Sequence, residues 1–157
     1  MRVGITGHRG LADETTGLIT ERLRQELHDL DGTLVGVSML AEGPDSIFAD
    51  EVLHQGGQLH VVIPASHYRE ELPAAHHPTY DRLLAQATDV ERLDYTDSTE
   101  EAHMAGSETM LDDIDLLLAV WDGQPARGYG GTADVVHAAE ERGIPVRVLW
   151  PEGATRD

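Results

Sequence analysis

Short apolar segments alternate with amphipathic segments along the whole chain, and this alternation constrains the fold more than any other feature. Apolar runs of strand length cover residues 3–6, 34–40, 58–64, 90–95, 116–121 and 145–150. Between them, apolar residues recur with helical spacing, as Leu18, Leu23 and Leu27 do after the first run. Strands that alternate with helices pair in parallel, and the helices cover both faces of the sheet. The pattern predicts one α/β domain over residues 1–157, with six mainly parallel strands.

The charge composition restricts the partners of such a chain. It carries 29 acidic residues against 11 basic ones, all of them arginine, for a formal net charge of −18. A surface that binds phosphates along a polynucleotide needs a basic face, so the composition predicts no nucleic-acid partner. A small anionic ligand stays compatible with it, because backbone amides and one or two arginines can hold one. The absence of lysine excludes Schiff-base chemistry and a P-loop.

The chain lacks cysteine and lacks any long apolar segment, and both absences exclude classes of protein. The chain has no cysteine, which excludes disulfides, thiol catalysis and cysteine-based metal sites. Its longest strongly apolar run, residues 116–121, is far shorter than the roughly 20 residues of a membrane span, and its first residues lack the apolar stretch of a signal peptide. We therefore expect a cytoplasmic protein with no membrane partner and no cofactor. We also expect no metal site, since His67, His76 and His77 lie in a proline-containing loop without ligand spacing and are typical of solvated side chains.

The segment 122–134 carries the strongest motif, because it joins a buried apolar run to a helix and contains Gly123, Gly128, Gly130 and Gly131. Glycines let a ligand approach the backbone, and a helix that begins at Thr132 offers unpaired N–H groups and the positive end of its dipole. This combination predicts a phosphate-binding loop. The alternative is a flexible loop in which Thr132 only caps the helix. If the loop binds phosphate, we expect a branched side chain at Gly131 to fill the anion position without changing the fold.

Two charged residues accompany this loop. Arg127 is a candidate clamp for the phosphate, or else a solvated loop arginine. Asp134 lies in the first helical turn, where the dipole stabilises an acid in any case. Its functional interpretation is a carboxylate that faces the ligand, either for a sugar hydroxyl or as a general acid or base.

The remaining candidates follow the other strands. Ligands of parallel sheets bind beyond the carboxyl ends of the strands, so the loops after the first three apolar runs belong to the same predicted site. The binding candidates there come from three loops, namely Gly7, His8 and Arg9 after the first run, Glu42, Gly43 and Asp45 after the second, and Pro64 at the end of the third.

Four segments together resemble a known superfamily: Gly4-Ile-Thr-Gly-His-Arg9, Leu40-Ala-Glu-Gly-Pro-Asp45, Val61-Val-Ile-Pro64, and Asp115 to Gly123 running into Gly130-Gly-Thr132. In order and spacing they are similar to the SLOG superfamily, the Rossmann-like group that contains Smf/DprA proteins, Lonely-guy enzymes and molybdenum-cofactor carrier proteins. The resemblance covers nearly the whole chain. It implies a Rossmann-like nucleotide-binding domain whose strands run in the order 4-3-2-1-5-6, and a homodimer. Met104, Met110 and Leu111 give the dimer indirect support, because they exceed what one narrow core stripe needs. The alternative is a helix that is simply well buried within the chain.

The Lonely-guy branch implies a specific reaction. Its Gly-Gly-x-Gly-Thr-x-x-Glu motif binds the phosphate of a nucleoside monophosphate, and the Glu acts with an Arg of the preceding helix to cleave the N-glycosidic bond. Here Gly128 to Asp134 resembles that loop, with Asp134 near the place of the Glu. The loop carries an insertion, however, and the preceding helix contains no Arg or Lys.

We therefore predict a protein that binds a nucleotide or a nucleotide-derived phosphorylated ligand as a carrier, sensor or regulator. The alternative is a nucleoside 5′-monophosphate hydrolase with Asp134 as its catalytic residue. A third possibility is a scaffold in a larger assembly.

Overall fold

Six parallel strands form one sheet in the order β4-β3-β2-β1-β5-β6 in the computed structural model, which describes residues 1–30 and 32–156. This confirms the predicted α/β class and strand order. The strands are β1 (Arg2–Gly7), β2 (Val35–Ser38), β3 (Gln58–Ala65), β4 (Asp89–Tyr95), β5 (Leu116–Val120) and β6 (Val146–Val148). The weakly apolar β4 lies at an edge of the sheet, as its sequence predicts.

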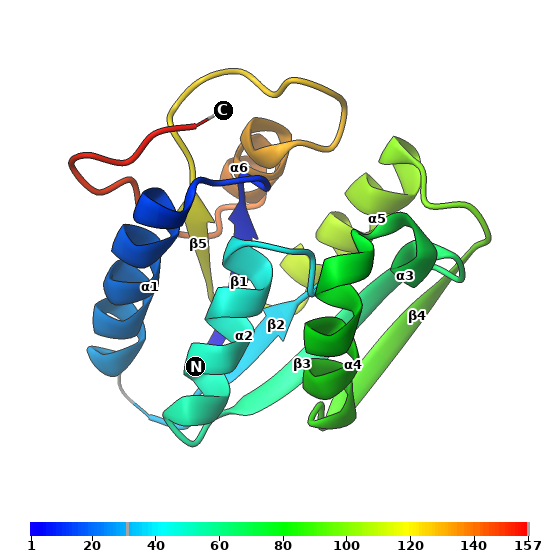
Figure 1. Cartoon of the computed structure of the whole chain (residues 1–157), viewed down its shortest axis with the longest axis horizontal. Helices are drawn as coiled ribbons and strands as arrows, with labels where there is room; N and C mark the ends of the chain where they lie inside the picture. Colours follow the sequence, from blue (N-terminus) through cyan, green and yellow to red (C-terminus); the bar gives the residue numbers. More distant parts are fainter. Residues whose placement is uncertain (31, 157) are drawn as a thin grey trace.

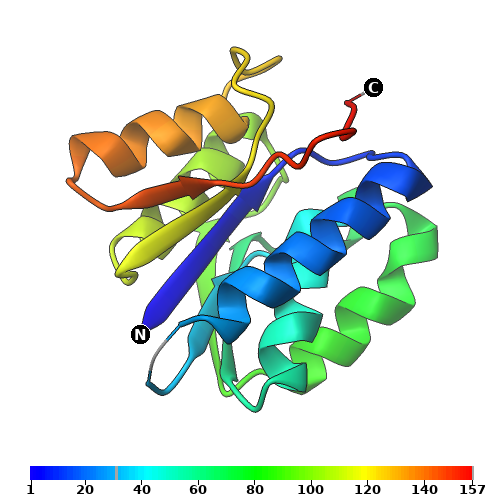
Figure 2. The same cartoon turned by 90° about the vertical axis from the view of Figure 1, so that its left-hand side faces the viewer.

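Helices cover both faces of the sheet (Figures 1 and 2). The helices are α1 (Asp13–His28), α2 (Pro44–His54), α3 (Tyr68–Glu71), η1 (Ala74–His76), α4 (His77–Ala85), α5 (Glu100–Leu111) and α6 (Thr132–Glu141). Figure 2 shows α1, α2 and α4 on one face of the sheet and α5 and α6 on the other. Among the described residues, no helix combines the length and apolarity that crossing a bilayer would need.

Alternating side chains of the central strands build the core on each face. Val3 and Ile5 of β1 pack with Ile19 and Leu23 of α1 and with Phe48 of α2, and all five are almost fully buried. On the opposite face, the helices α5 and α6 contribute the apolar side chains of Met110, Leu111, Val135 and Ala139. Burying a large apolar side chain stabilises the fold by about 1.5–3 kcal/mol. The carboxyl ends of the strands are thereby held on a rigid base.

One local feature differs from the sequence expectations, and the short helical turn that the sequence allows in the histidine loop (residues 65–78) is present. The spacing of Ser98 and Glu101 predicts a capping box, but Thr99 caps α5 and accepts from the Ala102 amide at 3.1 Å. Ser98 instead hydrogen bonds to His103 Nε2 at 2.6 Å. The histidine loop contains the short helices α3 and η1.

The interpretation of His76 and His77 as solvated is wrong. His76 Nε2 bonds to the Leu40 carbonyl oxygen at 2.9 Å, and His77 Nε2 bonds to the Arg69 carbonyl oxygen at 2.7 Å. His76 therefore fastens this loop to the turn after β2, whereas His77 bonds within the loop itself, to the carbonyls of Arg69 and Leu72. His67 remains exposed, 3.7 Å from an Asp97 carboxylate oxygen.

Candidate functional site

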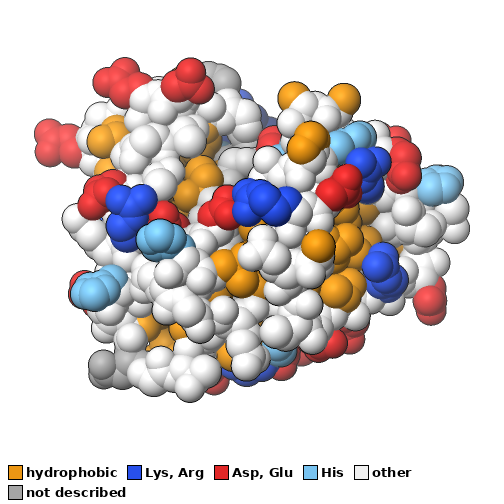
Figure 3. Space-filling view, turned by 60° about the horizontal axis from the view of Figure 1, so that its bottom comes forward, with side chains coloured by type: hydrophobic (Ala, Val, Ile, Leu, Met, Phe, Trp, Pro, Cys, Tyr) orange, Lys and Arg blue, Asp and Glu red, His pale blue; other side chains and the backbone are white. Residues whose placement is uncertain are grey.

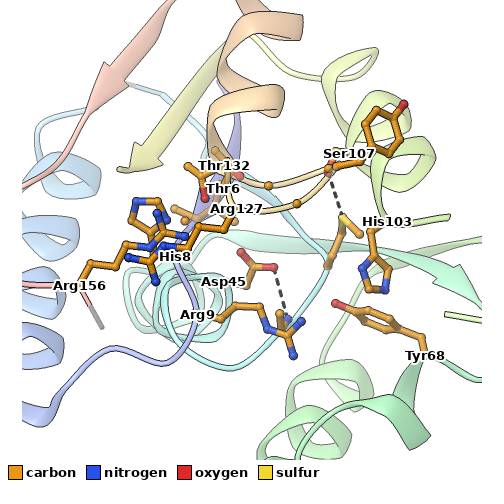
Figure 4. A pocket seen from close by; sticks show the side chains of 18 residues that line it. Thr6, His8, Arg9, Asp45, Tyr68, His103, Ser107, Arg127, Thr132 and Arg156 are labelled. Carbon is orange, nitrogen blue, oxygen red and sulfur yellow. Dashed lines mark hydrogen bonds between the residues drawn. The ribbon is translucent and has the colours of Figure 1, made fainter. Parts of the chain in front are cut away.

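A pocket of about 440 Å³ opens at the carboxyl ends of the central strands (Figure 4). Its walls come from the loop after β1, the turn after β2, helices α3 and α5, the glycine-rich loop after β5 and the C-terminal segment. The predicted site residues that line it are Gly7, His8, Arg9, Asp45, Arg127, Gly128, Gly130, Gly131 and Thr132. Parallel strands bring these loops together because all their carboxyl ends lie at the same edge of the sheet.

The start of α6 gives the pocket a set of hydrogen-bond donors. Gly131 precedes the helix with no side-chain cap, and Thr132 is 7% exposed and faces the pocket. The amides of Asp134 and Val135 already donate to the Gly131 carbonyl. Thr132 and the residue after it carry the first backbone N–H groups of α6, and such groups have no acceptor within a helix. The helix dipole adds positive potential at the same place. This corner is therefore suited to an anion.

Three of the eleven arginines line the same pocket: Arg9, Arg127 and Arg156. Arg9 is held by Glu42, whose two carboxylate oxygens accept from Nε and Nη2 at 2.6 and 2.8 Å. Arg156 lies 3.7 Å from an Asp122 carboxylate oxygen, and its side chain is 17% exposed. In a chain with a net charge of −18, this concentration of cations makes the pocket an exception to the general electrostatics of the protein.

His8 lies at the base of the cationic side of the pocket. It is 3% exposed, and its ring packs edge-on against Trp150. Its Nε2 lies 3.1 Å from both the amide nitrogen and a carboxylate oxygen of Asp122, while its buried Nδ1 has no partner among the described residues. Burial lowers the pKa of His8, and the positive charges of Arg156 and Arg127 lower it further against the opposing effect of Asp122. The ring is therefore neutral at physiological pH.

The carboxyl group of Asp45 has a pKa far above its ordinary value. Burial raises its pKa to about 7, and the hydrogen bond from the Ala41 amide together with the charge of Arg9 only partly opposes this. The turn that presents that amide includes Leu40 with a φ of +59°, a left-handed conformation that is rare without glycine. Leu40 is held there because Ser38 Oγ accepts from its amide and His76 bonds its carbonyl. A backbone outlier next to a carboxyl with a raised pKa is typical of a functional site.

The opposite half of the pocket was missed by sequence reasoning. Tyr68 from α3 and His103 and Ser107 from α5 lie there, as Figure 4 shows. Tyr129 from the glycine-rich loop also lines the pocket. His103 and Ser107 are four residues apart, so they share a helix face, which is the one signal in the sequence that could have found them. Tyr68 follows the third strand, but nothing in the sequence distinguishes it from a core residue. Arg156 lies in the last residues of the chain and has no sequence signal at all.

Five predicted site residues lie outside the lining of the pocket, namely Glu42, Gly43, Pro64, Gly123 and Asp134. Glu42 holds Arg9, and Gly43 has a φ of +90° before the first turn of α2. Pro64 packs near Gly106 of α5, where an added Cβ would lie 3.1 Å from the proline ring. Gly123, with a φ of +82°, forms a turn with open space around it. These contacts are structural, and the role of these four residues in ligand binding stays a prediction.

Asp134 also turns away from the expected role. Its Oδ2 accepts a hydrogen bond from the Gly130 amide at 2.9 Å, and it does not line the pocket. The carboxylate thus stabilises the glycine-rich loop, because an amide there would otherwise lack an acceptor.

The expectation for Gly131 is corrected as well. A Cβ on Gly131 would meet the Cβ of Ala126 at 2.9 Å and the Gly128 carbonyl oxygen at 3.2 Å. A branched side chain would therefore distort the loop rather than occupy the anion position.

Among the described residues, no group of three or more His, Asp or Glu side chains is arranged to hold a metal ion. Met104, Met110 and Leu111 are all buried within the chain itself, so they give a dimer no support. The homodimer remains a prediction from the resemblance alone.

Comparison with solved structures places this fold among known proteins. DNA processing protein A (DprA) from Streptococcus pneumoniae aligns with a TM-score of 0.69 at 17% identity over 97% of this chain, and DprA from Helicobacter pylori with 0.70 at 17% over 99%. A structural genomics target, TM1055, aligns with 0.60 at 15% over 92% of this chain and 71% of its own. This chain spans 51% of the S. pneumoniae chain and 68% of the H. pylori chain. No protein-family model and no curated sequence matches it. These structures share the fold that the resemblance to the SLOG superfamily implies.

The exclusion of a nucleic-acid partner is contradicted by this comparison. The H. pylori structure is described as showing a single-stranded DNA binding mode, so a protein of this fold binds DNA. On the face in Figure 3, most arginines in view lie beside acidic side chains. The prediction from net charge assumed that binding needs a broad basic face, whereas the local charge of a pocket can differ from the total.

Proposed function

We propose that the pocket binds a nucleotide through its phosphate group. The observation that carries this proposal is the convergence of three arginines and the start of α6 in one pocket of a chain with a net charge of −18. The pocket volume of about 440 Å³ lies in the range typical of small-molecule sites. In this arrangement Arg127 and the first amides of α6 hold the phosphate.

The other half of the pocket suits the rest of a nucleotide. Tyr68 and Tyr129 offer aromatic surface, and His103 and Ser107 offer polar atoms that can bond to a sugar hydroxyl or a base edge. Asp45 lies between the two halves and can either donate or accept, because its pKa is raised to about 7. A pocket with few polar groups at defined places is typical of specific binding.

Binding without turnover is the function that this site supports best. The helix α5 contains no Arg or Lys, and the carboxylate of Asp134 is bonded to the Gly130 amide. The site therefore lacks the pair that the hydrolase reaction would need, a basic residue on α5 and a carboxylate at position 134 that faces the ligand. A nucleoside monophosphate hydrolase remains the second candidate because of Asp45, since a carboxyl with a pKa near neutrality is what general acid–base catalysis requires.

Calorimetric titration tests the proposal. AMP, CMP, GMP and UMP are compared with their nucleosides and with a short single-stranded DNA, and the same mixtures are analysed by chromatography for released base. We expect at least one monophosphate to bind and its nucleoside to bind about tenfold more weakly or worse, since a phosphate held by charge-assisted bonds contributes more than about 1.4 kcal/mol.

The matched variants are Arg127→Gln in the pocket and Arg82→Gln on the exposed face of α4, where Arg82 pairs with Asp50 at 2.9 Å. Loss of binding in the first variant and not the second supports the site. Equal binding of phosphorylated and unphosphorylated ligands would refute it. Tighter binding of the DNA than of any monophosphate would assign the pocket to nucleotides within a strand. Base release that disappears in Asp45→Asn would establish the hydrolase.

A further inference from the structure

The C-terminal segment continues beyond β6 and crosses the carboxyl ends of the neighbouring strands. After β6, the Leu149 amide donates to the Ala119 carbonyl at 2.8 Å, which continues the contact with β5. A turn follows, closed by the bond from the Ala154 amide to the Pro151 carbonyl at 3.0 Å, with a φ of +91° at Gly153. Glycine at the third position of such a turn is what a type II turn requires. Figure 2 shows the segment passing the carboxyl end of β1 towards the first turn of α1.

A specific contact fastens the segment to α1. Thr15 is 1% exposed, and its hydroxyl oxygen accepts from the Thr155 amide at 3.0 Å. The two threonine hydroxyls lie 3.4 Å apart. A buried hydroxyl that accepts from a backbone amide costs free energy when it is removed, because the amide then lacks an acceptor. The position of the last residues therefore depends on Thr15.

This tether places Arg156 in the cationic half of the pocket. Its side chain lines the pocket together with His8 and Arg127 (Figure 4). Asp122 holds it from one side at 3.7 Å, and the same carboxylate accepts from the Gln124 amide at 3.0 Å. The segment also covers His8, whose ring packs on Trp150 with 5.7 Å between ring centroids.

The charge balance around Arg156 leaves it available to an anion. Asp122 also neighbours His8, but His8 is neutral, so Asp122 offers one negative charge to Arg156 at a distance longer than a direct hydrogen bond. Arg9, by contrast, is fully engaged by Glu42 through two short bonds. Arg156 can therefore turn its guanidinium to a phosphate oxygen without losing a bidentate partner.

We propose that residues 149–156 form part of the ligand-binding site and that Arg156 binds the phosphate group of the ligand. The hydrogen bond between Thr155 and Thr15 positions Arg156 for this contact. This rests on the proposed function for the identity of the ligand, but the anion site itself can be tested without a nucleotide. The segment thus contributes a binding residue that belongs to neither the glycine-rich loop nor the strand ends.

Three variants of the full chain test this proposal. Arg156→Gln removes the cation, Thr15→Val removes the tether, and Arg147→Gln is the matched control, because Arg147 lies on β6 and pairs with Glu26 at 3.2 Å away from the pocket. Each is titrated with inorganic phosphate, AMP and adenosine. We expect Arg156→Gln to weaken AMP by about tenfold or more and to remove the response to phosphate, with adenosine unchanged. Thr15→Val is expected to give a smaller loss of the same kind.

Each outcome decides between the two proposals. AMP binding that Arg156→Gln leaves within about twofold, or an equal loss in Arg147→Gln, refutes the role of Arg156 while the proposed function stands. If the protein binds phosphate through Arg156 but binds no nucleotide, the role of residues 149–156 is supported and the proposed function is refuted. Absence of any response of the wild type to phosphate and to all four nucleoside monophosphates refutes both. Circular dichroism melting of the ligand-free variants identifies a loss that comes from unfolding.

Discussion

The chemistry of the pocket depends on single residues whose properties their neighbours change. Asp45 shows this most clearly, because the same carboxylate in water would be largely ionised at pH 5. Here it lies beside buried Tyr68, and Glu42 adds negative charge nearby, while Arg9 and the Ala41 amide favour the ionised form. Burial outweighs them, so protonation of Asp45 changes in the physiological range.

The first prediction follows from the sign of this shift. A carboxyl whose pKa is raised on folding binds its proton more tightly in the folded state, so stability falls as pH rises from about 4 towards 7. We expect Asp45→Asn to raise the melting temperature at pH 8 relative to wild type by several degrees, since about 1 kcal/mol corresponds to roughly 2–4 °C in a chain of this size. At pH 4 the difference should nearly vanish. Melting curves across this range measure it, and a gain of equal size at both pH values would contradict it.

A second prediction concerns Asp134, which holds the Gly130 amide. Asp134→Ala leaves that amide without its acceptor and should reduce the free energy of unfolding by about 1–2 kcal/mol. Asp134→Asn keeps a carbonyl acceptor and should cost less. Urea denaturation of both variants gives the comparison. Equal losses would show that the negative charge at the helix start matters more than the hydrogen bond.

At the scale of elements, the glycine-rich loop and α6 form one unit with α5. Gly130 has a φ of +85°, and a Cβ there would lie 3.1 Å from the Glu100 carbonyl oxygen. Gly128 approaches the Glu100 carboxylate in the same way. The loop is therefore shaped by the start of α5 as much as by its own sequence, and the pocket depends on this packing.

The third prediction uses a matched pair of glycines in that loop. Gly123 and Gly130 have nearly the same φ, but only Gly130 has a neighbour that a Cβ would meet. Both Gly123→Ala and Gly130→Ala incur the left-handed backbone penalty of about 1–2 kcal/mol. We expect Gly130→Ala to lose more stability than Gly123→Ala in urea denaturation, and to lose ligand binding as well. Identical losses of stability in the two variants would show that α5 can shift to accommodate a Cβ at position 130 without a loss of free energy.

At the scale of the whole molecule, charge is the dominant feature. The excess of 18 acids over bases makes the folded chain repel itself. Most surface ion pairs, such as Arg69 with Asp81 at 2.8 Å, are exposed and add little stability each. Net repulsion should therefore outweigh their attraction.

The fourth prediction is that salt stabilises this protein. Between about 10 mM and 150 mM sodium chloride, the screening length falls from about 30 Å to about 8 Å, so repulsion across the molecule is screened. We expect the melting temperature to rise by several degrees over that range in the absence of ligand. A melting temperature that falls with salt would mean that the ion pairs outweigh the repulsion.

The sequence by itself determined the strands and helices, their arrangement as a parallel sheet with helices on both faces, and the edge of the sheet that carries the pocket. These follow from hydrophobic period and chain connectivity, which are local properties. It also identified His8, Arg127 and Thr132 as pocket residues, because each lies at the carboxyl end of a strand or the start of the helix that follows one.

Only the tertiary structure decided which side chains meet in that pocket. It turned Asp134 to the Gly130 amide and Glu42 to Arg9, and it brought Arg156 back across the sheet to His8. A side chain's direction depends on the partner that packing places nearby, and that partner can lie more than a hundred residues away in the chain, as Asp122 does from His8. No periodicity or spacing in the sequence records such a contact, because its free energy exists only once the core has formed.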